Sequence, residues 1–294
     1  MNLVSIIIPT YNRPDYLDRL LKSIKMQTFK NFEVIIIDDS SPQKSGYRKV
    51  IENYSRSITI CYYRNNINRG AQYCRNRGIS LSKCKYIAFV DDDDEWLPNK
   101  LEKQIILFES KSKNVALIYS WANTINQNNE IIFKYRKIFK KDNLMALLDS
   151  CFIPSPTVMI KREIFESVGG FDERLPSCQD WDMWTRIVEY GFEYDLVEEV
   201  LALHHKHNRI SLGKSPNSLY GFYLYYEKHT PYYLNLGMNK NLSEKYRALS
   251  FGFLQNKKYN FARISLKRSL KLWKFNYKSW YRLSQLILKD KGNL

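Results

Sequence analysis

Residues 86–96 read YIAFVDDDDEW, an apolar run that ends abruptly in four aspartates. A run without polar alternation is typical of a strand that is buried on both faces of a parallel sheet. Four more runs of this kind occur in the first 120 residues, separated by apolar residues at helical spacing. These strand candidates are Val4–Ile8, Phe32–Ile37, Ile58–Tyr63 and Val115–Tyr119. The sequence therefore predicts an α/β fold with a mainly parallel central sheet flanked by helices.

The length and composition predict one large domain with a smaller appendage. The chain has 294 residues, of which 44% are hydrophobic and 26% charged, as in ordinary globular proteins. We expect a first domain over 1–214 and a C-terminal helical appendage over 215–294, because the last stretch shows no β alternation. Two amphipathic segments of the appendage, 259–273 and 280–288, resemble one tetratricopeptide-type hairpin, although no repeat of about 34 residues is evident.

The positive charge is concentrated in the appendage. The formal net charge is +16, and residues 231–294 contain 14 Lys and Arg against two acids, a net charge of +12. Such a segment attracts anionic membranes, lipid-linked phosphates or nucleic acid. Three interpretations stay open: a solvated helical cap, a surface that docks on an anionic membrane, and a protein or nucleic-acid contact. Interleaved Trp and Tyr residues suit an interface with one wet and one apolar side.

Other features of the sequence predict a cytoplasmic protein. No apolar run reaches the roughly 18 residues of a spanning helix, and the N-terminus lacks the basic region of a secretory signal. The five cysteines are scattered and show no C-x-x-C spacing, so we expect reduced thiols.

Two acidic clusters follow the carboxyl ends of predicted strands. Asp38 and Asp39 end the second strand, and Asp91 to Asp94 end the fourth. Ligands of open α/β sheets bind at that edge. The clusters would repel each other unless a cation or hydrogen-bond donors compensate, and carboxylates suit Mg²⁺ or Mn²⁺ bridging a diphosphate. For Asp38 and Asp39 alone, an ordinary helix cap or turn is the competing interpretation.

Six motifs resemble those of the inverting family-2 glycosyltransferases of the GT-A fold, in that family's order and spacing. They are VSIIIPTYNR at 4–13, IDDSS at 37–41, NRG at 68–70 with RNRG at 75–78, AFVDDDDEW at 88–96, GGFDE at 169–173 and QDWDMW at 179–184. The match covers about residues 3–211. It implies a GT-A-like fold with a nucleotide-binding half over 1–110 and an acceptor half over 111–214.

The resemblance also implies which residues bind the donor, a nucleoside-diphosphate sugar with uridine as the first choice of nucleoside. Pro9, Thr10 and Tyr11 would line the base pocket, and Asp39 would contact the base or ribose. Arg75 would support the nucleotide-binding loop, with Asp91 and Asp92 also at the nucleotide. Asp91 and Asp93 match the family's D-x-D motif and would bind Mn²⁺ or Mg²⁺, and His207 could complete the metal shell.

By the same resemblance, Asp180 is the catalytic base, with Gln179 where the family commonly has Glu. Inverting transfer needs one carboxylate to take the proton of the acceptor hydroxyl. Capping of the following helix is the alternative role of Asp180, and the two roles could coexist.

The remaining candidate residues lie around the diphosphate and the acceptor. His205, Arg209 and Ser211 would contact the diphosphate in a stretch that could equally be an exposed loop. Trp181 and Trp184, with residues 154–157, could line a sugar-sized groove, because aromatic faces suit sugar rings.

Three classes of function therefore compete. The first is an inverting glycosyltransferase that builds a surface polysaccharide, glycolipid or glycan, acts on a glycan or lipid-linked acceptor, and contacts an anionic membrane through 231–294. The second is a non-catalytic module that binds nucleotide sugars. The third is a basic interaction module; nucleic acid is not expected as its partner, since no nucleic-acid motif occurs. An NAD enzyme is disfavoured, because no G-x-G-x-x-G follows the first strand.

Overall fold

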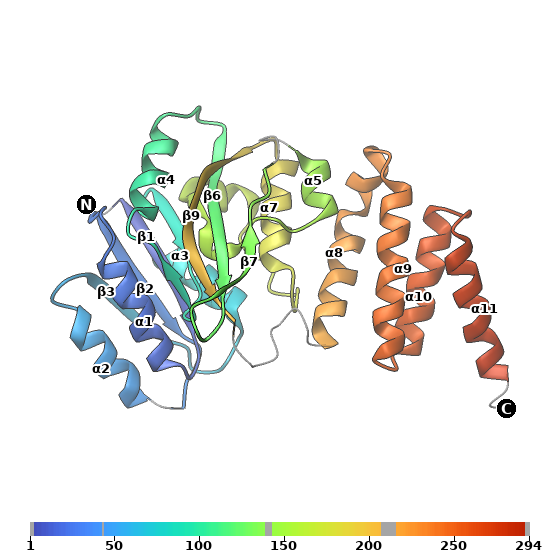
Figure 1. The fold of residues 1–294 in the computed structure, drawn as a ribbon, viewed down its shortest axis with the longest axis horizontal. Helices are drawn as coiled ribbons and strands as arrows, with labels where there is room; N and C mark the ends of the chain where they lie inside the picture. Colours follow the sequence, from blue (N-terminus) through green and yellow to red (C-terminus); the bar gives the residue numbers. More distant parts are fainter. Residues whose placement is uncertain (1–2, 43, 139–142, 207–215, 292–294) are drawn as a thin grey trace. The chain divides into compact units, whose positions relative to one another are not determined.

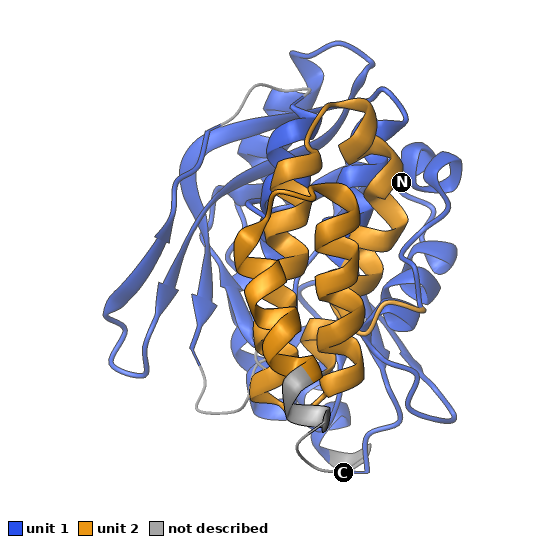
Figure 2. Ribbon diagram, turned by 90° about the vertical axis from the view of Figure 1, so that its right-hand side faces the viewer, with its two compact units in different colours: residues 1–173, 180–208 blue, residues 174–179, 209–294 orange. Residues whose placement is uncertain are grey.

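The computed structural model describes residues 3–42, 44–138, 143–206 and 216–291. The chain forms two compact units, which Figure 2 shows in different colours. Unit 1 comprises residues 1–173 and 180–208, and unit 2 comprises residues 174–179 and 209–294.

Unit 1 is built on one curled sheet with helices beside it (Figure 1). Its strands are β1 (Val4–Thr10), β2 (Phe32–Asp38), β3 (Thr59–Arg64), β4 (Tyr86–Phe89), β5 (Asp94–Trp96), β6 (Val115–Ile125), β7 (Ile131–Tyr135), β8 (Met159–Lys161) and β9 (Glu193–His205). Its helices are α1 (Pro14–Lys25), α2 (Lys44–Tyr54), α3 (Ala71–Leu81), α4 (Lys100–Glu109), α5 (Leu144–Asp149), α6 (Arg162–Val168) and α7 (Gln179–Glu189), with a 3₁₀ turn η1 (Ser155–Thr157). The predicted α/β fold is confirmed.

The sheet is parallel in its first half and mixed in its second. The strand order is β3-β2-β1-β4-β8-β6-β9-β5, with β7 paired to β6. Strands β3, β2, β1 and β4 run parallel, as do β6 and β9. Strands β8, β5 and β7 are antiparallel to their neighbours. The parallel half brings the carboxyl ends of β1, β2 and β4 to one edge.

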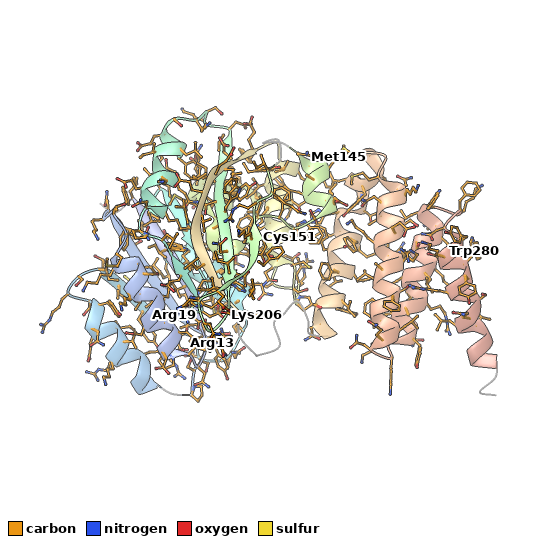
Figure 3. All side chains as sticks on the ribbon, viewed as in Figure 1. Arg13, Arg19, Met145, Cys151, Lys206 and Trp280 are labelled. Atoms are coloured by element: carbon orange, nitrogen blue, oxygen red, sulfur yellow. The ribbon has the colours of Figure 1, made fainter. Side chains whose placement is uncertain are left out.

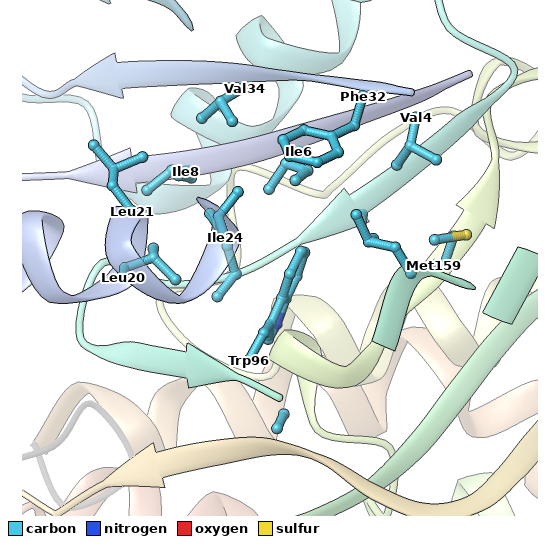
Figure 4. Packing of buried hydrophobic residues seen from close by; sticks show 14 of the residues in the cluster. Val4, Ile6, Ile8, Leu20, Leu21, Ile24, Phe32, Val34, Trp96 and Met159 are labelled. Atoms are coloured by element: carbon cyan, nitrogen blue, oxygen red, sulfur yellow. The ribbon is translucent and has the colours of Figure 1, made fainter. Parts of the chain in front are cut away.

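The core explains why the first strand is apolar without alternation. Val4, Ile6 and Ile8 of β1 point into one cluster, which also contains Leu20 of α1 (Figure 4). Ile7 points into a second cluster on the opposite face. Both faces of β1 are therefore buried, as expected for a central parallel strand.

Unit 2 is helical, which confirms the predicted C-terminal helical appendage. Its helices are α8 (Pro216–Asn235), α9 (Asn239–Gln255), α10 (Tyr259–Leu272) and α11 (Tyr277–Lys291). Residues 174–179 also belong to this unit, and the Ser177 hydroxyl donates to the carbonyl oxygen of Ser218 at 3.1 Å. Gly221 allows this approach, because a Cβ there would lie 2.8 Å from the Ser177 carbonyl oxygen.

Three apolar positions of α9 are followed 34 residues later by apolar positions of α11, the spacing of the tetratricopeptide-type hairpin that the sequence suggested. Tyr246, Leu249 and Phe253 of α9 recur as Trp280, Leu283 and Ile287 of α11, each 34 positions later. Leu249 and Leu283 are both buried. Tyr246 is only 1% exposed, whereas Trp280 is 55% exposed, so α9 and α11 do not bury this position alike.

Candidate active site

The site lies where β1, β2 and β4 end. Asp38 is the last residue of β2, and Asp91 to Asp94 follow β4. The backbone N–H of Asp39 donates to the carbonyl oxygen of Thr10 at 2.9 Å, which ties the turn after β2 to the end of β1. The two acidic clusters therefore share one edge of the sheet, as the strand pattern predicted.

The four consecutive aspartates do not face the same way. Asp92 and Asp94 are buried, whereas Asp91 and Asp93 are partly exposed, with side chains 38% and 19% exposed. A tight turn therefore separates two inward carboxylates from two outward ones. The outward pair is the Asp-x-Asp pair that the sequence singled out.

Asp92 is a structural residue of the turn. Its carboxylate accepts a hydrogen bond from the Thr10 hydroxyl at 2.7 Å and from Arg13 at 3.1 Å. The same guanidinium group donates to Asp93 at 2.8 Å. Burial raises the pKa of Asp92 to about 7, although Arg13 and Thr10 oppose that shift. Sequence reasoning gave Arg13 no role, because nothing local shows that it reaches a turn about 80 positions away.

Asp94 joins the turn to β9. It stands directly opposite His204 in the antiparallel β5–β9 pair, and its Oδ1 lies 2.7 Å from His204 Nδ1. The hydrogen bond with Asp94 raises the pKa of His204, and burial raises the pKa of Asp94. His205 Nε2 lies 2.9 Å from Glu95 Oε2. The histidine stretch is therefore strand at least to His205, where an exposed loop was an open alternative.

Arg75 is bound to Asp91 and acts on Asp180 through its charge. Its guanidinium group donates to Asp91 Oδ1 at 2.5 Å and is 5% exposed. Burial alone would lower the pKa of Arg75, but the charges of Asp91 and Asp180 raise it. Two further nitrogens of this group, Nε and Nη1, are buried without a hydrogen-bond partner in the part of the chain that the structure describes. Buried guanidinium donors without acceptors are costly, so they mark a place where an anion would be stabilised.

The position of Arg75 depends on close packing of α3. A Cβ at Gly78 would lie 2.6 Å from Cγ2 of Ile7, so only glycine lets α3 approach β1 this closely. The neighbouring Asn76 accepts a hydrogen bond from the N–H of Phe171 and donates to its carbonyl oxygen, both at 2.9 Å. Two motifs that are about 95 residues apart in sequence therefore meet beside Arg75.

Asp180 lies in the first turn of α7 and is partly buried. Its Oδ1 accepts a hydrogen bond from the N–H of Trp181 at 2.8 Å, so it stabilises the start of the helix. Burial raises the pKa of Asp180, while the Trp181 N–H and the charge of Arg75 oppose that shift. A raised pKa is the usual tuning of a carboxylate that accepts a proton near neutral pH.

The two tryptophans of this motif do not present open faces. Trp184 is a core residue that packs against Phe89 and Phe171, and the Trp181 indole N–H donates to the carbonyl oxygen of Leu147. Both rings are buried, which argues against the sugar-stacking role expected for them. Gln179, the residue before Asp180, is also buried.

Asp39 holds a loop. Its carboxylate accepts hydrogen bonds from the side chain of Asn65 and from the backbone N–H groups of Arg69 and Gly70, at 2.7–3.1 Å. Gly70 has φ +88°, a conformation that favours glycine. Asp39 thus fixes the NRG loop beside the end of β1, where Tyr11 is exposed.

The donor atoms at this edge fit a hard cation. Asp91 and Asp93 offer carboxylate oxygens, and Mg²⁺ or Mn²⁺ binds proteins through one or two carboxylates plus phosphate oxygens and water. Among residues 3–42, 44–138, 143–206 and 216–291, no group of three His, Cys, Asp or Glu side chains could hold a metal by itself. His207, Arg209 and Ser211, expected at the metal and diphosphate, lie outside the described residues.

Known proteins resemble this chain in sequence and in fold. The model described as Glycosyl transferase family 2 matches residues 5–169. The putative colanic acid biosynthesis glycosyl transferase WcaA of Escherichia coli (strain K12) is 28% identical over 274 residues, which cover 87% of this chain and 89% of WcaA.

Two solved structures share the fold. Residues 1–349 of S. aureus TarS, in complex with UDP, give a TM-score of 0.67 at 17% identity, covering 99% of this chain and 92% of that chain. The mannosyltransferase PcManGT from Pyrobaculum calidifontis, in complex with GDP-Man and Mn²⁺, gives 0.57 at 15% identity, covering 97% and 84%. These likenesses confirm the predicted GT-A-like fold.

Proposed function

Because this chain belongs to glycosyl transferase family 2, we propose that it moves a sugar with inversion from a nucleoside-diphosphate sugar to an acceptor hydroxyl. The observation that carries the proposal is the line Asp91–Arg75–Asp180. It sets a carboxylate for the donor, a buried cation and a carboxylate with a raised pKa beside one another at the ligand-binding edge of the sheet.

Asp180 is the general base of this reaction. As the acceptor oxygen attacks the anomeric carbon, the carboxylate takes the hydroxyl proton, and no covalent sugar–enzyme intermediate is needed. The charge of Arg75 favours the ionised form of Asp180 against the effect of burial, and its Nε and Nη1 are donors for an anion. The departing diphosphate is the anion that this arrangement would stabilise.

The nucleotide is held by the end of β1 and by the turns after β1 and β2. Pro9, Thr10 and Tyr11 line the base pocket, with the exposed ring of Tyr11 available to the base. Asp39 fixes the loop beside the ribose. In the turn that would hold the metal, Asp91 is the residue that contacts the nucleotide. Asp92 contributes indirectly, because its carboxylate holds Thr10 and Arg13 in place.

Asp91 and Asp93 would hold Mn²⁺ or Mg²⁺. The metal would supply positive charge to the leaving diphosphate. His207, Arg209 and Ser211 belong to the same proposal, since they follow β9 directly in sequence. His205 would contact the diphosphate. It is the last residue of β9, and its side chain is bound to Glu95.

The substrates are proposed from the relatives. TarS is described in complex with UDP, which supports uridine diphosphate as the carrier, and WcaA is described as acting in colanic acid biosynthesis. We therefore propose that the acceptor is a surface polysaccharide, a glycolipid or another glycan.

A peripheral contact with the inner face of the cell membrane completes the proposal. None of the helices in the described ranges is long and apolar enough to cross a bilayer. Residues 231–294 carry a net charge of +12, and Tyr277, Trp280 and Tyr281 of α11 are exposed. Figure 3 labels Trp280 on this helix. Basic residues interleaved with exposed aromatic residues suit an anionic membrane surface.

A thermal-shift screen of nucleoside diphosphates tests the donor site. Uridine, guanosine, deoxythymidine, cytidine and adenosine diphosphates are each measured with Mn²⁺ and with a chelator. We expect uridine diphosphate to raise the Tm with Mn²⁺ and the chelator to remove the shift, because binding to the native state stabilises it by mass action. If no nucleotide raises the Tm under either condition, the chain is a module without a working donor site.

A further inference from the structure

Strand β7 of the β6–β7 hairpin of unit 1 carries several exposed apolar side chains. Strand β7 is antiparallel to β6, and the turn between them is closed by Asn126, whose side-chain oxygen accepts the N–H groups of Asn128 and Glu130 at 2.9 Å. In the described part of the sheet, β7 pairs with β6 alone, so its other edge is open. Figure 1 shows β7 beside β6.

The apolar side chains of this hairpin are exposed on both faces of the strand. Ile131, Ile132 and Phe133 are 50%, 44% and 55% exposed, and Ile138 just beyond the strand is 58% exposed. Successive strand residues point to opposite faces, and on the face of Ile131 and Phe133 only Tyr135, among the described residues of this strand, packs against the core. The Phe133 ring contacts that of Tyr135 at a centroid distance of 4.7 Å and is still 55% exposed. An open edge with exposed apolar residues normally marks an interaction site.

The charge of the hairpin selects the kind of partner. Residues 131–138 contain Lys134, Arg136 and Lys137 and no acid. Lys134 and Lys137 are exposed, whereas Arg136 is bound to the carbonyl oxygen of Ala122 and to the side chain of Asn123. Two copies paired edge to edge would bring these like charges together, which is unfavourable. An anionic surface with an apolar interior complements both the exposed lysines and the exposed apolar side chains of the hairpin.

Strand pairing links the hairpin to the candidate active site. Ile125 of β6 is paired with His205 of β9, and the backbone N–H of Lys206 donates to the Ile125 carbonyl oxygen at 2.9 Å. The preceding pair joins Thr124 to His204, which in turn is bound to Asp94. A membrane surface bound to the hairpin would therefore lie a few strands away from the turn that carries Asp91 and Asp93.

From this combination we propose that residues 131–138 dock on the headgroup region of an anionic phospholipid bilayer. Ile131, Ile132, Phe133 and Ile138 enter the interface, and Lys134 and Lys137 contact the lipid phosphates. The inference deepens the membrane contact proposed above by adding a site on the unit that carries the catalytic residues. Only the biological role of this contact rests on the proposed function. The binding to lipid is measured in the absence of sugar transfer.

Sedimentation with vesicles tests the proposal on the full chain. Phosphatidylglycerol mixed with phosphatidylcholine is compared with phosphatidylcholine alone. We expect binding to the anionic vesicles only, and a partition coefficient about fivefold lower for each of Lys134→Gln and Lys137→Gln. Phe133→Ala should lower it about tenfold, because less apolar area enters the interface.

Matched variants keep the result interpretable. Ile106→Ala alters an exposed apolar side chain of α4, 60% exposed, and should bind vesicles as the wild type does. Trp280→Ala separates the contribution of α11 from that of the hairpin. The thermal shift with uridine diphosphate and Mn²⁺ is recorded for each variant, so a failed donor site and a failed membrane site give different results.

Two outcomes would overturn the proposal. One is unchanged vesicle binding by the combined Phe133→Ala, Lys134→Gln and Lys137→Gln variant. The other is a concentration-dependent dimer in sedimentation velocity that Phe133→Ala abolishes, because the edge would then be covered by a second copy of the chain.

Discussion

The guanidinium group of Arg75 lies 2.5 Å from Oδ1 of Asp91, and its charge also acts on Asp180. One buried cation is thus shared by the carboxylate proposed to hold the donor and the carboxylate proposed to accept the proton. Loss of a donor contact at Asp91 would change the field at Asp180. Binding and chemistry are therefore expected to be coupled through this residue.

Asp180→Asn should lower kcat by about 10²-fold or more and leave nucleotide binding near normal. The amide keeps the shape of the side chain and can still accept the Trp181 N–H, but it cannot take a proton. Turnover and the thermal shift with uridine diphosphate are measured together. Asp15→Asn, at an exposed position of α1, is the matched control, and turnover of Asp180→Asn near the control value would remove Asp180 as the base.

The pH profile of kcat should have its acid limb above the ordinary aspartate pKa of about 3.9. Burial raises the pKa of Asp180, and only its ionised form accepts a proton, so activity falls as pH drops through the raised value. Arg75→Met should shift that limb to higher pH, because the charge that lowers the pKa is lost. Arg75→Lys keeps a positive charge and should shift it less. If the acid limb of both variants lies at the same pH as that of the wild type, Arg75 does not tune the pKa of Asp180.

Asp93→Ala and Asp92→Ala should have different consequences. Asp93 faces outward, so its loss should abolish the Mn²⁺ dependence of nucleotide binding with little change in the free energy of unfolding. Asp92 is buried, and its loss removes the carboxylate acceptor of the Thr10 hydroxyl and one of the two carboxylate acceptors of Arg13, which should cost about 1–3 kcal/mol. Urea unfolding and thermal shift measure the two effects. Unchanged Mn²⁺-dependent affinity in Asp93→Ala would contradict the metal assignment.

Asp39→Ala should lower the free energy of unfolding by about 3 kcal/mol. It removes the acceptor of the Asn65 side chain and of two backbone N–H groups, those of Arg69 and Gly70. Asp39→Asn retains one carbonyl acceptor and should lose less. If both variants unfold at the same urea concentration as the wild type, the loop does not depend on this carboxylate.

Leu266→Ala should destabilise unit 2 by about 2–5 kcal/mol, because this side chain of α10 is fully buried. Ile264→Ala, on the exposed side of the same helix, should change stability by less than about 0.5 kcal/mol. Calorimetry measures both. Equal effects of the two substitutions would mean that α10 does not bury the face described above.

The sequence predicted most of the parallel sheet because burial on both faces leaves a strong local signal. The runs around Val4, Phe32, Thr59 and Tyr86 are strands β1 to β4, and the helical appendage is also confirmed. Short elements such as β8, three residues long, leave no comparable pattern. Strand β9 was not predicted, because the sequence pattern from about 120 to 215 is irregular and the histidine stretch could equally be an exposed loop.

Which aspartates face outward could not be predicted, because the answer depends on distant partners. Arg13 and His204 compensate the charge of the turn, and each reaches it from a segment about 80–110 positions away. The sequence indicated that the negative charge of the aspartates must be compensated. It did not show that Arg13 and His204 of the same chain supply part of that compensation. The 34-residue spacing between α9 and α11 is not visible as a repeat in the sequence, because Trp280 stands in the place of Tyr246 and the two side chains differ in burial.

The two units differ in what an insertion would do to them. An insertion of one residue into β1 would turn every later side chain of the strand to the opposite face. A helix pair added beside α11 would instead leave the contacts among the earlier helices of unit 2 unchanged, as in stacked helical folds. Such an addition to unit 2 would therefore leave the register of β1, and with it the candidate site at the end of that strand, unchanged.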